Sequence, residues 1–343
     1  MRCPMFVPQR VIFETGSLDY NLGQKLYSHF KNTDIEINEC SLNKVKSCIP
    51  GDNATSQYLN GKVTLVVGVK KSLTFQTCKP SAHYQLPLVS GCIGQCEYCY
   101  LNTQLGDKPF IRVYVNLEEI LTQATKYITD RLPEITIFEG AATSDPVPVE
   151  PYTGSLKSSI NFFAEQPNAR FRFVTKYTDI DDLLNLDHKN HTDVRFSLNT
   201  DRIIKAYEHK TASSKKRIEA SAKLLSSQYP IGFIIAPVFI YEGWQQEYKE
   251  LLFNLRQALP STATSPITFE VISHRYTTKA KNRITEIFPE TTLDMEDETR
   301  QFKYGQFGYG KYVYPKDSLS EVKEFFTNEI TSIFKNGIIK YII

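Results

Sequence analysis

The sequence predicts an α/β protein whose main part is a (β/α)6 partial TIM barrel. Two observations predict this fold. From residue 85 onward, six short apolar runs rich in β-branched residues alternate with helical patterns. Polar and reactive side chains recur directly after those runs, where a barrel carries its chemistry. We expect an N-terminal α/β extension at residues 1–84, the barrel at 85–290, and a C-terminal β-hairpin with a helix at 291–343.

Two elements are recognisable in the extension. A helix is expected near residues 22–30, and the β-branched run KVTLVVGVKKSLTF at 62–75 predicts a strand. Residues 84–90 (YQLPLVS) are then predicted to form the first barrel strand, which delivers a cysteine-rich loop. An amphipathic helix follows at 116–132, with Asn116 as its N-cap.

The rest of the barrel is predicted from five further strands and five helices. The strands are expected at 134–140, 170–176, 193–199, 230–240 and 266–274. The helices are expected at 153–165, 178–186, 212–227, 243–258 and 277–288. Strands that are apolar almost throughout are typical of a parallel sheet with right-handed helical crossovers. Candidate site residues lie at the predicted strand ends: Cys92, Glu139–Asp145, Lys176, Ser197–Asn199, Pro237 and His274.

Composition limits the function classes. With 343 residues, 41% of them apolar, the chain can bury a large core. The net charge is only +2, so a nucleic-acid surface must be a local patch. No apolar run approaches the roughly 18 residues that indicate a membrane span, and the first ten residues lack the apolar core of a signal peptide. We expect a soluble cytoplasmic monomer without a membrane partner.

The stretch SGCIGQCEYCYLNTQ at 90–104 places Cys92, Cys96 and Cys99 in a C-x3-C-x2-C array. In a reducing compartment such clustering favours metal binding or thiol chemistry over disulfides. A structural zinc ion would need a fourth ligand, such as a distant cysteine or His83, yet no cysteine follows Cys99. Three thiolates on one loop can instead hold a 4Fe–4S cluster by three irons and leave the fourth iron open.

This loop resembles the signature of the radical S-adenosylmethionine (AdoMet) superfamily, in which an aromatic residue precedes the third cysteine. Tyr98 supplies that aromatic here. The resemblance implies that AdoMet chelates the open iron. One-electron reduction, by a donor such as flavodoxin or ferredoxin, then yields a 5′-deoxyadenosyl radical that abstracts a hydrogen atom from the substrate.

Stretches over most of the chain resemble the spore photoproduct lyase family. They include FVPQRVIFE, KPSAHYQLPLVSGCIGQCEYCYLNTQLGDKPFIRVYVNLEEIL, FEGAATSDPV, RFVTKY, RFSLN, GFIIAPVF, FEVISHRYTTKAK and KYGQFGYGKYVY. The resemblance implies a DNA repair lyase that binds UV-damaged DNA. It reverts the lesion 5-thyminyl-5,6-dihydrothymine, the spore photoproduct, to two thymines. Catalytic roles are implied for Tyr98 and Tyr100, and Tyr98 is also a candidate for binding the cofactor.

Four polar residues at strand ends are candidates for binding AdoMet. The hydroxyl of Ser144 could bind the amino-acid moiety of AdoMet or the substrate, or could cap the following helix. The ammonium of Lys176 could pair with the AdoMet carboxylate, as the corresponding lysine of the family does. Ser197 and Asn199 lie on one face of their strand, because side chains alternate along a strand, and they suit ribose hydroxyls or the methionyl group.

The DNA or substrate candidates lie near the C-terminus. His274 and Arg275 could orient substrate or phosphate, although His274 could equally be a structural residue. The stretch RQFKYGQFGYGKYVY at 300–314 predicts a β-hairpin. The hairpin could cap the barrel, or it could open the duplex and stack on the lesion. In the second case its candidates are Lys303, Tyr304, Gln306 and Lys311, although the family commonly has arginine where this chain has Gln306.

One position departs from the family pattern. Family members commonly carry at the position of Ala142 a cysteine that gives a hydrogen atom to the thymine radical. An engineered substitution, another donor, or altered chemistry would each explain the alanine. Cys78, where family members often have serine, is the candidate replacement donor. Its alternative role is that of a small apolar filler.

Two other functions remain open. The same scaffold could serve a radical AdoMet enzyme that acts on another nucleic acid or a peptide. A zinc-stabilised DNA-binding protein is the non-enzymatic alternative. The colour of the anaerobically purified protein separates the last from the others, because an iron–sulfur cluster is brown and zinc is colourless.

Overall fold

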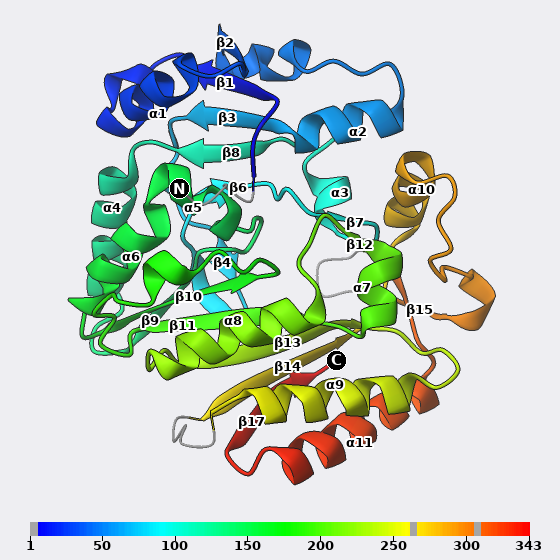
Figure 1. Cartoon of the computed structure of the whole chain (residues 1–343). Helices are drawn as coiled ribbons and strands as arrows, with labels where there is room; N and C mark the ends of the chain where they lie inside the picture. The colour runs from blue at the N-terminus through cyan, green and yellow to red at the C-terminus, as the bar shows by residue number, and fades with distance from the viewer. Residues whose placement is uncertain (1–5, 261–265, 305–309) are drawn as a thin grey trace. The chain divides into compact units, whose positions relative to one another are not determined.

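The computed structural model describes residues 6–260, 266–304 and 310–343 (Figure 1). By compactness the chain divides into two units, and each is described by itself. The first unit comprises Met1–Gly94 and Gln104–Asp193, and the second comprises Gln95–Thr103 and Val194–Ile343. The three-part division expected from the sequence stays a prediction. In the described part of the chain, no helix has the length and apolar character that crossing a membrane requires.

The N-terminal segment of unit 1 builds a five-stranded sheet in the order β2-β1-β3-β8-β6 (Figure 1). Its strands are β1 Arg10–Glu14, β2 Glu36–Cys40, β3 Thr64–Gly68, β6 Val89–Ser90 and β8 Ile111–Tyr114. All pairings are parallel except that of β6 with β8. The helices α1 Asn21–Lys31 and α2 Ala54–Lys62 connect its first three strands. The predicted helix at 22–30 is confirmed, and the predicted strand at 62–75 is shortened to β3.

Unit 1 also contains four strands in the order β10-β9-β5-β4. They are β4 Thr77–Cys78, β5 Ala82–Gln85, β9 Thr136–Glu139 and β10 Ala169–Thr175. Strands β5, β9 and β10 are parallel, and β4 joins β5 as an antiparallel strand. The helices of this part are α4 Leu117–Thr129, α5 Glu150–Thr153 and α6 Ser155–Ala164.

The predicted strand at 84–90 is wrong as a single element. The structure divides it between β5, which pairs with β9, and β6, which pairs with β8 in the other sheet. Pro87 lies at the break. Proline has no N–H to donate to a ladder, so it interrupts a central strand.

Two predictions about helices also differ from the structure. Residues 178–186 form no α-helix but only a short 3-10 turn, Asp181–Leu183, because their short polar side chains favour turns. Asn116 does occupy the N-cap of α4 without a side-chain cap bond. Its side chain donates instead to Lys70 O at 3.0 Å and to Glu119 Oε2 at 2.8 Å.

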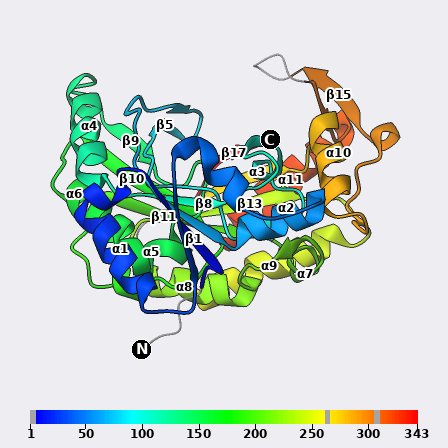
Figure 2. The same cartoon turned by 90° about the horizontal axis from the view of Figure 1, so that it is seen from above.

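Unit 2 contains four parallel strands in the order β17-β14-β13-β11. They are β11 Thr192–Leu198, β13 Ile231–Val238, β14 Ile267–Ser273 and β17 Gly337–Ile342. The helices are α3 Leu101–Gln104, α7 Asp201–Tyr207, α8 Ser214–Ser226, α9 Trp244–Ala258, α10 Thr278–Ile287 and α11 Lys316–Ile333. Helices α9 and α11 run side by side (Figures 1 and 2). Neither α7 nor β17 is among the elements expected from the sequence.

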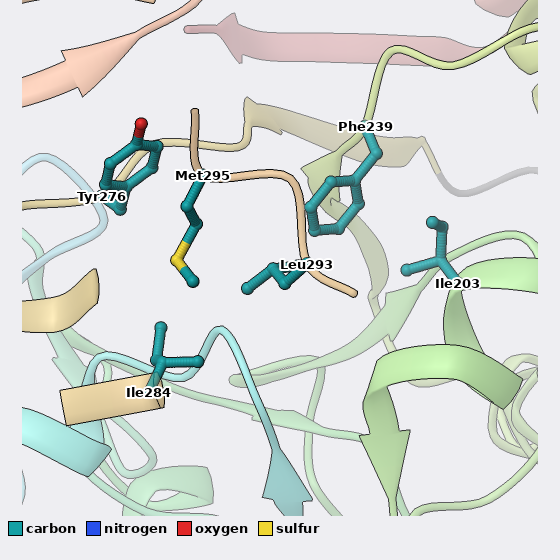
Figure 3. Close-up of a cluster of buried hydrophobic side chains, with 6 residues drawn as sticks. All are labelled: Ile203, Phe239, Tyr276, Ile284, Leu293 and Met295. Carbon is teal, nitrogen blue, oxygen red and sulfur yellow. The ribbon is translucent and has the colours of Figure 1, made fainter. Parts of the chain in front are cut away.

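A cluster of buried side chains lies beyond the carboxyl ends of the unit 2 strands. Figure 3 shows its members converging from several segments: Ile203, Phe239, Tyr276, Ile284, Leu293 and Met295. Tyr98 and Tyr312 pack against this cluster from the cysteine loop and from the C-terminal hairpin. The cysteine loop and the C-terminal hairpin therefore pack against the same hydrophobic cluster.

The predicted hairpin is confirmed within the described residues. Strand β15 Gln301–Tyr304 pairs antiparallel with β16 Gly310–Val313, and this register sets Lys303 opposite Lys311. The hairpin is attached to the segment after β14 by two backbone hydrogen bonds between Tyr276 and Tyr312, at 3.1 and 2.7 Å. Their rings stack 5.3 Å apart.

Candidate active site

Cys92 lies just after β6, and several contacts fix its backbone. Gly91 has a positive φ of 84°, and a Cβ there would collide with the carbonyl oxygen of Phe110, so only glycine fits. The buried ammonium of Lys62 donates to Cys92 O at 2.8 Å. The N–H of Gly94 donates to Cys92 Sγ at 3.3 Å. An N–H···S bond of this kind stabilises a thiolate and tunes the metal that it binds.

Cys96 and Cys99 belong to unit 2. Strand β7 Gln95–Cys96 pairs antiparallel with β12 Glu208–His209, which sets Cys96 opposite Glu208 (Figure 1). The buried side chain of Asn102 donates to Cys96 O and to Glu97 O, each at 3.1 Å. The N–H of Cys99 donates to Cys96 O at 3.2 Å. This part of the loop is thus held through its backbone.

The donor set fits an iron–sulfur cluster. Among the described residues, no three His, Cys, Asp or Glu side chains gather closely enough to hold a single metal ion. Three cysteine thiolates are the donors that a 4Fe–4S cluster takes from a protein, with one thiolate on each of three irons. The Nδ1 of His83, considered above as a fourth zinc ligand, accepts the N–H of Ile137 at 2.9 Å.

Asp145 organises the strand ends of β9 and β10. Its Oδ1 accepts from Thr175 Oγ1 at 2.9 Å, and its Oδ2 accepts from the N–H of Lys176 at 2.9 Å. Ser144, the preceding residue, forms a parallel bridge with Gly91. Its Oγ is buried and has no hydrogen-bond partner in the described part of the chain. Ser144 does not cap a helix, since Pro146 and Val149 occupy the following N-cap positions; that alternative is wrong.

Ser197 lies near the end of β11 and Asn199 directly follows the strand, and both are buried. The carboxamide of Asn199 is engaged within the protein. It donates to Pro237 O at 2.8 Å and accepts from Tyr248 Oη at 2.7 Å. Asn199 therefore braces the end of β11 against β13 and α9, and its contact with a cofactor stays a prediction. The carbonyl of Ser197 accepts from Arg217 Nη1 at 3.0 Å.

The two tyrosines of the cysteine loop differ in environment. The hydroxyl of Tyr98 donates to Glu208 Oε1 in a short hydrogen bond, and its ring lies 5.8 Å from that of Phe239. Burial, followed by the charge of Glu208, raises the pKa of Tyr98 well above its usual value, so the phenol stays protonated. Tyr100 is 50% exposed. Only Tyr100 has much surface to offer a large substrate.

Cys78 and Ala142 both belong to unit 1. In β4, Cys78 pairs with Ala82 of β5, and β5 in turn pairs with β9, which ends three residues before Ala142. Both residues are half-buried, and none of the six described cysteines is in a disulfide. One strand, β5, thus separates the strand of Cys78 from the strand that leads to Ala142.

His274 is a buried, neutral residue. It is 2% exposed, and its ring stacks on Phe239 with the centroids 4.5 Å apart. Burial, and then the charge of Arg300, lowers the pKa of His274 to about 3. In the described part of the chain its Nδ1 has no hydrogen-bond partner. The neighbouring Arg275 is exposed.

The hairpin carries the features expected of a nucleic-acid contact. Tyr304 is 80% exposed and Phe302 is 48% exposed. Lys303 lies opposite Lys311 in the hairpin, and Arg275 directly precedes Tyr276, whose backbone pairs with that of Tyr312. Burial lowers the pKa of Lys311, and the charges of Arg275 and Lys303 lower it further. Gln306 lies outside the described residues.

Sequence reasoning missed the polar residues that support the site. Asp145 was noted only as part of a strand end, and Glu208 and Arg217 were not singled out. The motif SDP at 144–146 gave a local hint of Asp145. Nothing local marks Glu208, because its partner Tyr98 is 110 positions away in the sequence.

Comparisons with known proteins agree with this geometry. A family model described as spore photoproduct lyase matches residues 6–343. Curated spore photoproduct lyases are 54% identical in Clostridium acetobutylicum and 46% identical in Bacillus subtilis, with 98% of both chains covered in each case.

Solved structures of spore photoproduct lyase are equally similar. One is a double variant, with a cysteine-to-alanine and a serine-to-cysteine substitution, with bound AdoMet and dinucleoside spore photoproduct. It is 43% identical, with a TM-score of 0.95 over 98% of this chain and 99% of that chain. A tyrosine-to-phenylalanine variant is 43% identical, with a TM-score of 0.94 over 98% of this chain and 99% of that chain. This likeness confirms the predicted mixed α/β, partial-barrel fold.

Proposed function

The chain belongs to the spore photoproduct lyase family, and from this premise we propose how its own residues serve the reaction. The enzyme is a radical AdoMet lyase that repairs spore photoproduct, with a 4Fe–4S cluster and AdoMet as cofactors. The observation that carries this function is 54% identity over 98% of the chain to a curated spore photoproduct lyase. The C-x3-C-x2-C loop lies within that matched length.

Cys92, Cys96 and Cys99 hold the cluster in this proposal. When bound, the cluster and AdoMet supply the 5′-deoxyadenosyl radical that takes a hydrogen atom from the lesion. The protein's part is to present three thiolates and to keep the loop rigid. The Gly94 N–H at Cys92 Sγ and the two Asn102 hydrogen bonds support this role.

Ser144 and Lys176 bind the amino-acid end of AdoMet in this proposal. A buried hydroxyl without a partner is costly, so Ser144 Oγ is ready to accept or donate to a ligand. The ammonium of Lys176 complements a carboxylate. Asp145 supports both, because it lies next to Ser144 and accepts the N–H of Lys176. Ser197 and Asn199 contact the ribose hydroxyls or the methionyl group of AdoMet in this proposal.

Cys78 donates the hydrogen atom that completes repair in this proposal. A thiol S–H is weak enough to quench a carbon radical, and Ala142 has no such hydrogen. The solved double variant supports the assignment. Its two substituted positions are 64 residues apart, as Cys78 and Ala142 are, and the substitutions are of the same two kinds.

Tyr100 lies beside the reacting groups in this proposal. The substituted tyrosine of the solved tyrosine-to-phenylalanine variant lies 42 residues before the substituted cysteine of the double variant, as Tyr100 lies before Ala142. Tyr98 supports the loop from its buried position.

The hairpin and Arg275 contact DNA in this proposal. Lys303, Lys311 and Arg275 supply a local positive patch for phosphate, which suits a chain of net charge +2. The exposed ring of Tyr304 can stack on an unpaired base. We assign Gln306 to the same contact and His274 to the support beneath it. The protein works as a cytoplasmic monomer and takes its electron from a donor such as flavodoxin or ferredoxin.

An anaerobic repair assay tests the function. The reconstituted protein is incubated with dinucleoside spore photoproduct, AdoMet and a chemical reductant. We expect thymine nucleoside to form only when AdoMet and reductant are both present. Cleavage of AdoMet without any loss of spore photoproduct would favour a radical enzyme with another substrate. A protein that purifies without iron and binds zinc would contradict the cofactor assignment.

A further inference from the structure

A fully buried arginine lies behind the cysteine loop in unit 2. The side chain of Arg217 in α8 has no exposed surface and donates to four acceptors. Its Nε donates to Ala212 O at 2.8 Å and its Nη1 to Ser197 O at 3.0 Å. Its Nη2 donates to Thr211 Oγ1 at 2.7 Å and to Glu208 Oε2 at 2.6 Å.

Glu208 links Arg217 to the cysteine loop, because it accepts hydrogen bonds from both. While its Oε2 binds Arg217, its Oε1 accepts the hydroxyl of Tyr98, which lies between two cluster ligands in the sequence. The backbone of Glu208 also pairs with that of Cys96 in the β7–β12 ladder. The buried residue Glu208 therefore contacts the loop through both its side chain and its backbone.

The network joins two segments that bind cofactors in the proposed function: the end of β11, which contacts AdoMet, and the cysteine loop, which binds the cluster. One end is the carbonyl of Ser197 at the end of β11, and the other is the ring of Tyr98 in the cysteine loop. The planar guanidinium offers donors in fixed directions, which a flexible ammonium does not. Because both charges are buried and hydrogen-bonded, the pair tolerates little displacement.

We propose that Glu208 and Arg217 are positioning residues that hold the cysteine loop in a fixed relation to the end of β11, and so set the geometry in which AdoMet binds. The proposal rests on the proposed function. It assigns no chemistry to either residue, since neither needs to touch the reacting atoms. The alternative is a pair that stabilises α8 alone.

The two possibilities differ in what happens to the loop. If the pair only stabilises α8, its loss changes the unfolding temperature and leaves residues 95–103 as ordered as before. If it positions the loop, Tyr98 loses its acceptor and the loop opens more often in the folded protein. Hydrogen–deuterium exchange reports this opening in the metal-free protein, without any catalysis.

The test compares Glu208→Gln, Arg217→Lys and Tyr98→Phe with Glu219→Gln, a matched change at an exposed position of the same helix. Amide exchange of residues 95–103 is measured on each metal-free full-length protein. The Kd of AdoMet is then measured on the reconstituted proteins. For Glu208→Gln we expect exchange and Kd to rise on the order of tenfold, as for the loss of one hydrogen bond to a charged group.

Two further results are expected. Arg217→Lys keeps the positive charge but loses the planar guanidinium with its fixed set of donors, so it should loosen the loop as well. The double variant Tyr98→Phe with Glu208→Gln should loosen the loop by less than the sum of the two single changes, because both changes act on the same contact. If Glu208→Gln does not fold, Tyr98→Phe decides, since it removes only a hydroxyl.

Unchanged exchange of 95–103 in every folded variant, relative to Glu219→Gln, would overturn the proposal. The proposal would also be overturned if the Kd for AdoMet rose as much in Glu219→Gln as in Glu208→Gln. Failure of the proposed function looks different. In that case the unsubstituted protein releases no thymine, while the exchange comparison still decides whether the network holds the loop.

Discussion

The backbone N–H of Lys176 donates a hydrogen bond to Asp145 Oδ2 at 2.9 Å, across 31 positions of sequence. The other oxygen of this carboxylate accepts from Thr175 Oγ1 at 2.9 Å and from the N–H of Val147 at 3.3 Å. One buried side chain thus fixes the loop after β9 to the end of β10. Ser144, its neighbour in sequence, and Lys176, whose N–H it accepts, are the two residues proposed to bind the amino-acid end of AdoMet.

Replacing Asp145 should therefore weaken AdoMet binding without removing any ligand. Asp145→Ala loses three hydrogen bonds to a charged acceptor, so we expect a loss of about 2 kcal/mol in unfolding free energy and a Kd for AdoMet raised about tenfold. Denaturant unfolding and calorimetric titration measure the two effects. Asp187→Ala, at an exposed position, is the control. An unaltered Kd in Asp145→Ala would remove it from the site.

Each cluster ligand should be indispensable. Changing Cys92, Cys96 or Cys99 to Ala leaves two thiolates, too few to retain a 4Fe–4S cube, so iron content and AdoMet cleavage should both fall to background. Iron and sulfide analysis after anaerobic reconstitution checks this. Cys48→Ala, in the N-terminal sheet region, should keep the full iron content. A ligand variant that also kept it would show that the cluster is bound elsewhere.

Cys78→Ala should separate AdoMet cleavage from repair. Radical formation does not need this thiol, so 5′-deoxyadenosine should still appear, while the yield of thymine falls and by-products of the unquenched radical form instead. Chromatography of both products from one reaction gives the ratio. The reciprocal variant, Ala142→Cys in the Cys78→Ala background, should recover repair. If Cys78→Ala repairs at the parental rate and Ala142→Cys alone brings a large gain, the donor assignment is wrong.

Charge reversal on the hairpin should alter the salt dependence of DNA binding. Lys303→Glu removes one phosphate contact, so the slope of log K against log salt should become shallower by about one. Binding of lesion-containing DNA is measured at several salt concentrations. Lys335→Glu, an exposed lysine after α11, controls for net charge. Equal slopes for the two variants would limit the hairpin to a structural role.

Buried His274 should make the protein sensitive to acid. Its pKa is about 3 in the fold and about 6.5 when unfolded. Below the unfolded pKa the unfolded chain binds a proton that the folded protein excludes. Stability is therefore complete above about pH 6.5 and falls by up to about 1.4 kcal/mol for each pH unit below it.

Urea unfolding between about pH 4 and pH 7 measures this loss. His274→Phe keeps the stacking on Phe239 and should flatten the pH dependence. The same change at exposed His29 should not. A parallel pH profile in His274→Phe and the parent would mean that other groups cause the acid sensitivity.

Local sequence was enough to predict much of this protein. All five strands predicted between 134 and 274 appear within a few residues of the expected bounds, because a buried strand needs a continuous apolar run. The cluster ligands were evident for a similar reason. All three cysteines lie within one short stretch of sequence, where their spacing can be read directly. The comparisons confirm the resemblance to the spore photoproduct lyase family.

Only the tertiary structure decided which residues support that loop and where the first barrel strand ends. The break at Pro87 depends on which of two sheets each half of 84–90 can pair with. Strand β17 depends on β14 as its partner. Tyr98, Glu208 and Arg217 form one buried network although they come from three separate segments. Hydrogen-bond partners that distant leave no periodic pattern in the sequence, since folding alone brings them together.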